Sequence, residues 1–84
     1  KMEITNEEVE KLKNEYPPGT KVRCIHMDDP YHPVPCNTEG IVEKVDDGGT
    51  IHINWDNGSS LGLIPNVDVF EKVTMSSKKR EMER

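Results

Sequence analysis

A chain of 84 residues with a formal charge of −5 has room for one small domain. Its acidic charge argues against a general nucleic-acid binder, which needs a basic face to displace phosphate counterions, and against binding to an anionic membrane. No apolar run is long enough for a transmembrane helix or a signal peptide, so the expected location is the cytoplasm. Two cysteines fit a reducing compartment.

The first expected element is a helix over residues 5–15. Thr5 and Glu8 have the spacing of a capping box, and Pro17-Pro18 ends the helical pattern. A helix of this length is not stable alone in water, so its apolar stripe must dock on the following sheet or on a partner. That stripe consists of Val9, Leu12 and Tyr16.

Short strands separated by turns follow the helix. They are expected at residues 21–27, 39–45, 51–55, 61–63 and 69–73, with a helical turn at 65–68. Asn57-Gly58 predicts a type I′ hairpin turn. The alternation of apolar and polar residues within 21–27 is imperfect. Strands this short need closure or near-closure to hide their edges.

The fold class that this pattern favours is mainly β, a small SH3-like five-stranded barrel with an N-terminal α-helix. An OB-type barrel is the main alternative. The expected organisation is a helix and Pro-Pro linker at 1–17, the barrel at 18–73 and a flexible charged tail at 74–84.

Three motifs carry a resemblance to a known family. They are Tyr16-Pro17-Pro18-Gly19-Thr20, Met27-Asp28-Asp29-Pro30 and Trp55-Asp56-Asn57-Gly58-Ser59-Ser60-Leu61. Over about residues 16–73 the chain resembles short bacterial domains of unknown function, which occur in Gram-positive bacteria, their phages and conjugative elements. The family pattern has Pro-Gly where this chain has Cys36-Asn37. The resemblance implies no activity.

Two sets of side chains could bind metal. Cys24, His26, His32 and Cys36 are ligand types for zinc, but their spacing lacks the usual paired-ligand template. The aspartates at 28–29, 46–47 and 56 could hold a divalent cation or act as an acid–base pair. Each lies at an expected turn, where aspartate is common for structural reasons. We therefore expect no metal site and no cofactor.

The candidate binding residues lie in the proline-rich segment 28–38 and in the Trp55 hairpin. They are Asp28, Asp29, Pro30, Tyr31, Trp55, Asp56, Asn57, Ser59 and Ser60. Aromatic and proline side chains of this kind line peptide grooves on SH3-like domains. Two structural explanations compete: Trp55 fills the core, or the two segments brace each other through hydrogen bonds.

Two functional hypotheses follow. The first is a non-enzymatic interaction module that binds a protein or peptide partner, for which the resemblance implies a phage or mobile-element setting. The second is a small-molecule or nucleotide binder, or a weak metal-dependent hydrolase, that uses the clustered aspartates. A deep polar pocket with converging carboxylates would favour the second, and a shallow apolar groove would favour the first.

Overall fold

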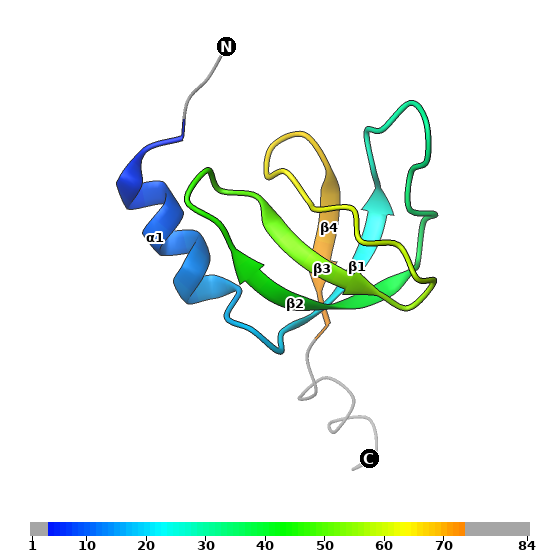
Figure 1. Cartoon of the computed structure of the whole chain (residues 1–84), viewed down its shortest axis with the longest axis horizontal. Coiled ribbons are helices and arrows are strands. Elements are labelled where there is room, and N and C mark those ends of the chain that lie inside the picture. Colours follow the sequence, from blue (N-terminus) through cyan, green and yellow to red (C-terminus); the bar gives the residue numbers. More distant parts are fainter. Residues whose placement is uncertain (1–3, 74–84) are drawn as a thin grey trace, which may run out of the picture.

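The computed structural model describes residues 4–73, which form one helix and a four-stranded antiparallel sheet (Figure 1). The elements are α1 (Asn6–Glu15), β1 (Lys21–His26), β2 (Glu39–Val45), β3 (Ile51–Trp55) and β4 (Val69–Lys72). The strand order in the sheet is β3-β2-β1-β4. Within residues 4–73, no helix has the length and apolar character needed to cross a bilayer. The predicted tail at 74–84 lies outside the described residues.

The predicted helix start is confirmed. The Thr5 hydroxyl accepts a hydrogen bond from the Glu8 amide at 3.1 Å, and the Glu8 carboxylate accepts one from the Thr5 amide at 3.0 Å. The predicted apolar stripe also faces the sheet, with Val9 buried and the other two residues packed against the core. Tyr16 at the helix end makes an edge-to-face contact with Phe70, at 5.7 Å between ring centroids.

Two β-bulges explain the imperfect alternation along the strands. The pairing of β1 with β4 shifts register between Cys24 and His26, so Cys24 and Met27 can both lie in the core. The pairing of β2 with β3 shifts between Val42 and Lys44 in the same way. A bulge adds one residue to a strand and so reverses which face the following side chains occupy.

The expected closed, five-stranded barrel is not what the structure shows. The sheet is open, with β3 and β4 at its two edges, and residues 61–63 make only an isolated bridge between Ile51 and Leu63. The reason lies in Leu61. Its carbonyl accepts a hydrogen bond from the Trp55 indole at 2.8 Å, and its amide donates to the Ser59 hydroxyl at 3.2 Å. Side chains thus form hydrogen bonds with the Leu61 amide and carbonyl, which in a fifth strand would pair with a neighbouring strand.

The turn after β3 differs from the expected type I′. Gly58 has a φ of 89°, as predicted, but Asn57 is not at positive φ. The Gly58 amide donates to the Trp55 carbonyl at 3.0 Å, and the Trp55 amide donates to the Ser59 carbonyl at 3.2 Å. The hairpin therefore has a three-residue loop with one left-handed residue, the second commonest solution for a tight hairpin.

Gly58→Val should lower the free energy of unfolding by roughly 1–2 kcal/mol. No atom of the described residues lies within 4 Å of where a Cβ would stand, so the cost comes from the backbone conformation and not from a clash. Asn tolerates the left-handed region, so Gly58→Asn should cost much less. Urea denaturation of the three proteins checks this, and equal losses in both variants would contradict it.

Candidate interaction surface

The proline-rich loop after β1 is anchored at its end and in its middle. The Asn37 amide donates to the Cys24 carbonyl at 2.7 Å, and the Cys24 amide donates to the Thr38 carbonyl at 2.8 Å. Val34 is only 2% exposed, and its amide donates to the Met27 sulfur at 3.3 Å. These contacts tie Val34 and the end of the loop to the core, although Pro35, Cys36 and Asn37 are exposed like the tip.

Asn37, near the end of this loop, has an unusual backbone conformation. Its φ of 76° is in the left-handed region, which glycine adopts without strain and asparagine tolerates better than other residues. A glycine at this position could therefore adopt the same backbone conformation.

The loop tip is held by a buried carboxylate that comes from far away in the sequence. Asp68 is 8% exposed; its Oδ1 accepts a hydrogen bond from the Asp28 amide at 2.8 Å, and its Oδ2 accepts one from the Ile64 amide, also at 2.8 Å. The Asp68 amide in turn donates to the Ile64 carbonyl at 2.9 Å. One side chain therefore joins the loop after β1 to the turn at 64–68.

The remaining tip residues are fixed locally. Asp29 accepts hydrogen bonds on Oδ1 from the Tyr31 amide at 2.8 Å and the His32 amide at 3.2 Å, the pattern of an Asx turn. Tyr31 is 81% exposed at the end of this turn, next to the exposed Pro30. The Asp28 carboxylate is exposed as well, because Asp28 contributes its backbone to the contact with Asp68.

Asp68→Ala should lower the free energy of unfolding by about 2–3 kcal/mol, because it leaves two amides without their charged acceptor. Asp28→Asn is the matched control and should change stability by less than about 0.5 kcal/mol, since within residues 4–73 only the Asp28 backbone makes a hydrogen bond. Thermal or urea melts of both variants measure this. A loss at Asp28→Asn as large as that at Asp68→Ala would show that the Asp28 side chain braces the fold.

The structure separates the Trp55 hairpin from the loop tip. The Trp55 ring is 4% exposed, so it lies in the core and not in a groove. The turn after β3 and the tip of the loop after β1 are at different places on the molecule (Figure 1). Among residues 4–73, no hydrogen bond joins them: the Asp56 amide donates to the Glu39 carbonyl, and Asn57 accepts from the Ser59 amide. The two segments do not brace each other, and Ser60 is exposed beside the hairpin.

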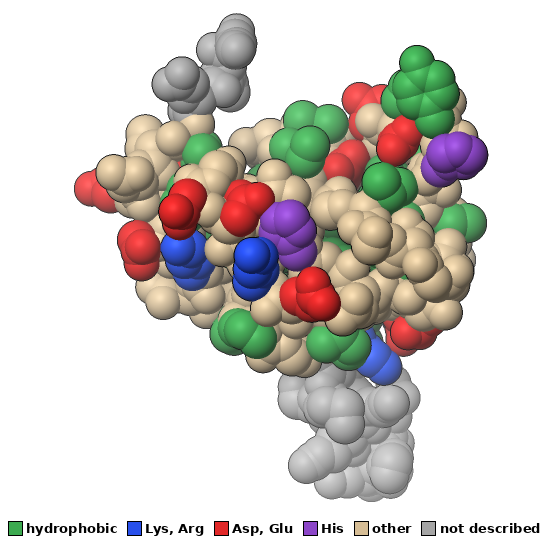
Figure 2. Space-filling view, viewed as in Figure 1, with side chains coloured by type: hydrophobic (Ala, Val, Ile, Leu, Met, Phe, Trp, Pro, Cys, Tyr) green, Lys and Arg blue, Asp and Glu red, His purple; other side chains and the backbone are tan. Residues whose placement is uncertain are grey.

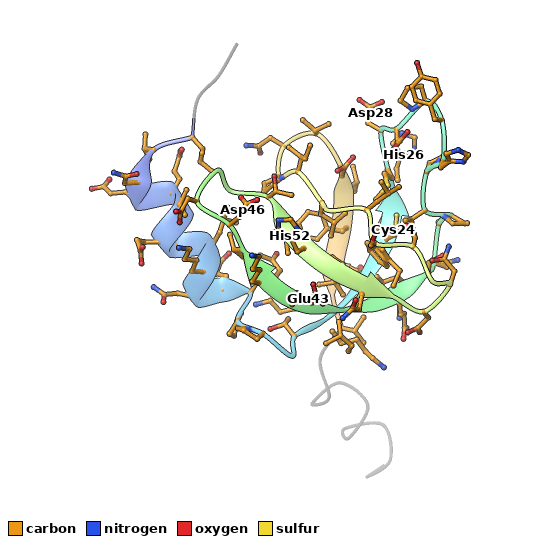
Figure 3. All side chains as sticks on the ribbon, in the orientation of Figure 1. Cys24, His26, Asp28, Glu43, Asp46 and His52 are labelled. Carbon is orange, nitrogen blue, oxygen red and sulfur yellow. The ribbon has the colours of Figure 1, made fainter. Side chains whose placement is uncertain are left out.

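The aspartates do not converge. Asp28 and Asp46 lie well apart (Figure 3), and Asp46 accepts hydrogen bonds from the Gly48 and Thr50 amides within its own turn. Asp47 pairs instead with Lys13 at 3.2 Å. In the described part of the chain, no three His, Cys, Asp or Glu side chains are grouped so that they could hold a metal ion. Both cysteines are free thiols, Cys24 buried and Cys36 exposed.

Asp46 makes folding stability sensitive to acid. The hydrogen bond from His52, at 2.8 Å, and those from the Thr50 and Gly48 amides lower the pKa of Asp46 below its ordinary value. A lowered folded-state pKa stabilises the fold above the unfolded pKa, and this stabilisation is lost as the pH falls through the folded pKa.

The stability difference between wild type and Asp46→Asn should therefore be larger near pH 7 than at about pH 2. Urea denaturation at both pH values measures it. Asp47→Asn is the control, because its carboxylate is fully exposed and should show little difference at either pH. A constant Asp46→Asn effect across this range would show that the charge is not involved.

A shallow groove runs between α1 and the turn at 64–68. Its apolar lining comes from Ile4, Leu12, Ile64, Pro65 and Val67, and Gly48 and Gly49 also line it. Ile64 is 48% exposed and Val67 47%. In Figure 2, hydrophobic side chains gather over the turn before β4 and at the tip of the loop after β1, with acidic side chains between them.

Sequence reasoning singled out neither the groove nor Asp68. The sequence indicates only a helical turn at residues 65–68, although Ile64 and Val67 are large apolar residues beside a turn proline. Two aliphatic side chains in one short turn could have indicated a contact surface, since they must either be buried or lie exposed to solvent as an apolar patch. Nothing in the sequence indicates that Asp68 binds Asp28, forty residues away.

A family model described as "Domain of unknown function (DUF4314)" matches residues 5–73. The chain belongs to this family. No curated protein and no solved structure matches the chain. Membership therefore agrees with the expectation of a domain of unknown function and brings no activity or partner with it. Any functional statement has to rest on the surface described above.

Proposed function

We propose that this DUF4314 domain is a non-enzymatic interaction module that binds a protein or peptide. Its contact surface is the interaction edge, which we define as Asp28–Tyr31 together with Ile64–Asp68. The observation that carries the proposal is that exposed apolar side chains stand on turns held by the buried Asp68 carboxylate.

The energetics of binding favour such an edge. A turn that is already held by hydrogen bonds loses little conformational entropy when a partner binds. Tyrosine is enriched at protein interfaces because its ring supplies contact area and its hydroxyl a hydrogen bond. The 81% exposed ring of Tyr31 has both available. The acidic side chains of Asp28 and Asp29 beside it would select against acidic partners.

The alternative, a small-molecule or nucleotide site or a hydrolase built on clustered aspartates, finds no support in the geometry. The carboxylates lie on separate turns, and most are engaged with nearby backbone amides or with Lys13 or His52. We further propose that the domain acts in the cytoplasm of a bacterium and is encoded by a phage or mobile element. The phage or mobile-element part rests only on the sequence motifs that resemble the family.

The test uses peptides selected from a random library against the wild-type domain. Their dissociation constants are then measured for wild type, Tyr31→Ala and Ile64→Ser by fluorescence anisotropy. Each variant should weaken binding by about tenfold, the loss expected for removing one partly buried apolar contact.

Ile41→Ser is the matched control, because Ile41 is 37% exposed but lies on β2, away from the interaction edge. Its affinity should equal that of wild type. A library that yields no binders, or binders that are indifferent to Tyr31 and Ile64, would refute the proposed surface.

A further inference from the structure

The groove between α1 and the turn at 64–68 differs in kind from a strand-binding edge. One wall is the face of α1 that carries Glu8, Leu12 and Glu15, and the other is the segment from Ile64 to Val67. None of the lining residues belongs to a strand. The groove therefore offers side chains and no free β-ladder, so an extended peptide could not add to it as a strand.

An occupant of such a groove must satisfy its own backbone hydrogen bonds. Its backbone amides and carbonyls would otherwise lose water against apolar walls without gaining partners. A helix meets this condition, because its hydrogen bonds are internal, and it can present an apolar stripe to the floor. The groove follows α1, whose ten residues span about 15 Å, so it accommodates about three turns of a partner helix.

The charges along the groove specify the partner further. Glu8 and Glu15 are seven residues apart on the same face of α1, and they flank the apolar Leu12. Lys11 is the one cation among the lining residues. Across residues 4–73, acidic side chains also outnumber basic ones, so the long-range field adds to the local one.

We propose that this groove binds a cationic amphipathic helix of about three turns. Two or three aliphatic side chains on one face of the helix would pack on Leu12, Ile64 and Val67, and lysine or arginine beside that stripe would face Glu15 and Glu8. This inference deepens the proposed function and rests on it, since it names the chemical class of partner for one part of the surface.

The probe is a fluorescein-labelled synthetic helix of leucine and lysine, with leucines at i, i+4 and i+7. Two reference peptides accompany it: a scrambled peptide of the same composition, and a leucine–glutamate helix with the same pattern. The leucine–lysine helix should bind most tightly, as measured by anisotropy. Its affinity should fall as salt is raised, because the ion pairs lie at the rim of an open groove.

Variants of the groove test the assignment of residues. Val67→Ser and Glu15→Lys should each weaken binding of the leucine–lysine helix by about tenfold. Lys11→Glu should strengthen it, because it removes the one cation from the lining. Ile41→Ser and Glu10→Lys are the controls, since both residues are exposed and neither lines the groove. Ile41→Ser should leave affinity unchanged, and Glu10→Lys, which alters the net charge as much as Glu15→Lys does, should weaken binding much less than Glu15→Lys. Melting curves confirm that each variant is folded.

Several outcomes would overturn the inference. Equal binding of the scrambled peptide would mean unspecific attraction by charge, and equal binding of the leucine–glutamate helix would rule out charge selection. Self-association of the domain, lost in Val67→Ser, would assign the groove to a second copy of the chain. If the leucine–lysine helix fails to bind while library peptides still depend on Tyr31, the groove inference is wrong and the proposed function stands.

Discussion

The buried carboxylate of Asp68 is the interaction on which the candidate surface depends. It accepts one hydrogen bond from each of two turns that are far apart in the sequence, at the Asp28 amide and at the Ile64 amide. A buried carboxylate is costly unless its oxygens are satisfied, and here two backbone amides satisfy them. Because the turns share one acceptor, the positions of Tyr31 and Val67 are fixed relative to each other. A rigid surface is the condition for a small domain to bind without a large loss of entropy.

The other aspartates show how turn chemistry can resemble a catalytic cluster in sequence. Asp29 and Asp46 each accept two amide hydrogen bonds within a few residues, and these contacts give each of them a structural role. Only Asp28 has a carboxylate that is free of such contacts among the described residues and also stands at the interaction edge. The two adjacent aspartates therefore have different roles: Asp29 holds the loop, and the carboxylate of Asp28 faces solvent.

The open sheet has a consequence for the groove. In a closed barrel, the segment after β3 would continue as a strand and its backbone would be paired along its length. Here Leu61 binds the Trp55 indole and the Ser59 hydroxyl, and within described residues 60–68 only Leu63 forms a β-bridge with β3. The chain then leaves the sheet as a turn, and Ile64 and Val67 are presented next to α1 instead of being buried in a fifth strand. The buried Trp55 therefore contributes indirectly to the exposure of Ile64 and Val67, because its indole holds the Leu61 backbone.

The sequence by itself determined the elements whose signals are local. Spacing and residue type alone specify the capping box of α1, its apolar stripe, the positive φ of Gly58 and the positions of all four strands. The candidate site was predictable only in part: Asp28–Tyr31 lies at the surface, as a proline-rich loop predicts, but Trp55 lies in the core.

Only the tertiary structure decided the rest, because it depends on contacts between residues far apart in the chain. Nothing in the sequence predicts that these segments meet. Their contacts include the burial of Trp55, the anchoring of Val34 and the hydrogen bond between Asp68 and Asp28. Whether residues 61–63 form a strand also depends on whether side chains such as Trp55 and Ser59 occupy the hydrogen-bonding groups of their backbone. Alternation of apolar residues specifies which face is buried, but it does not specify the partner that buries it.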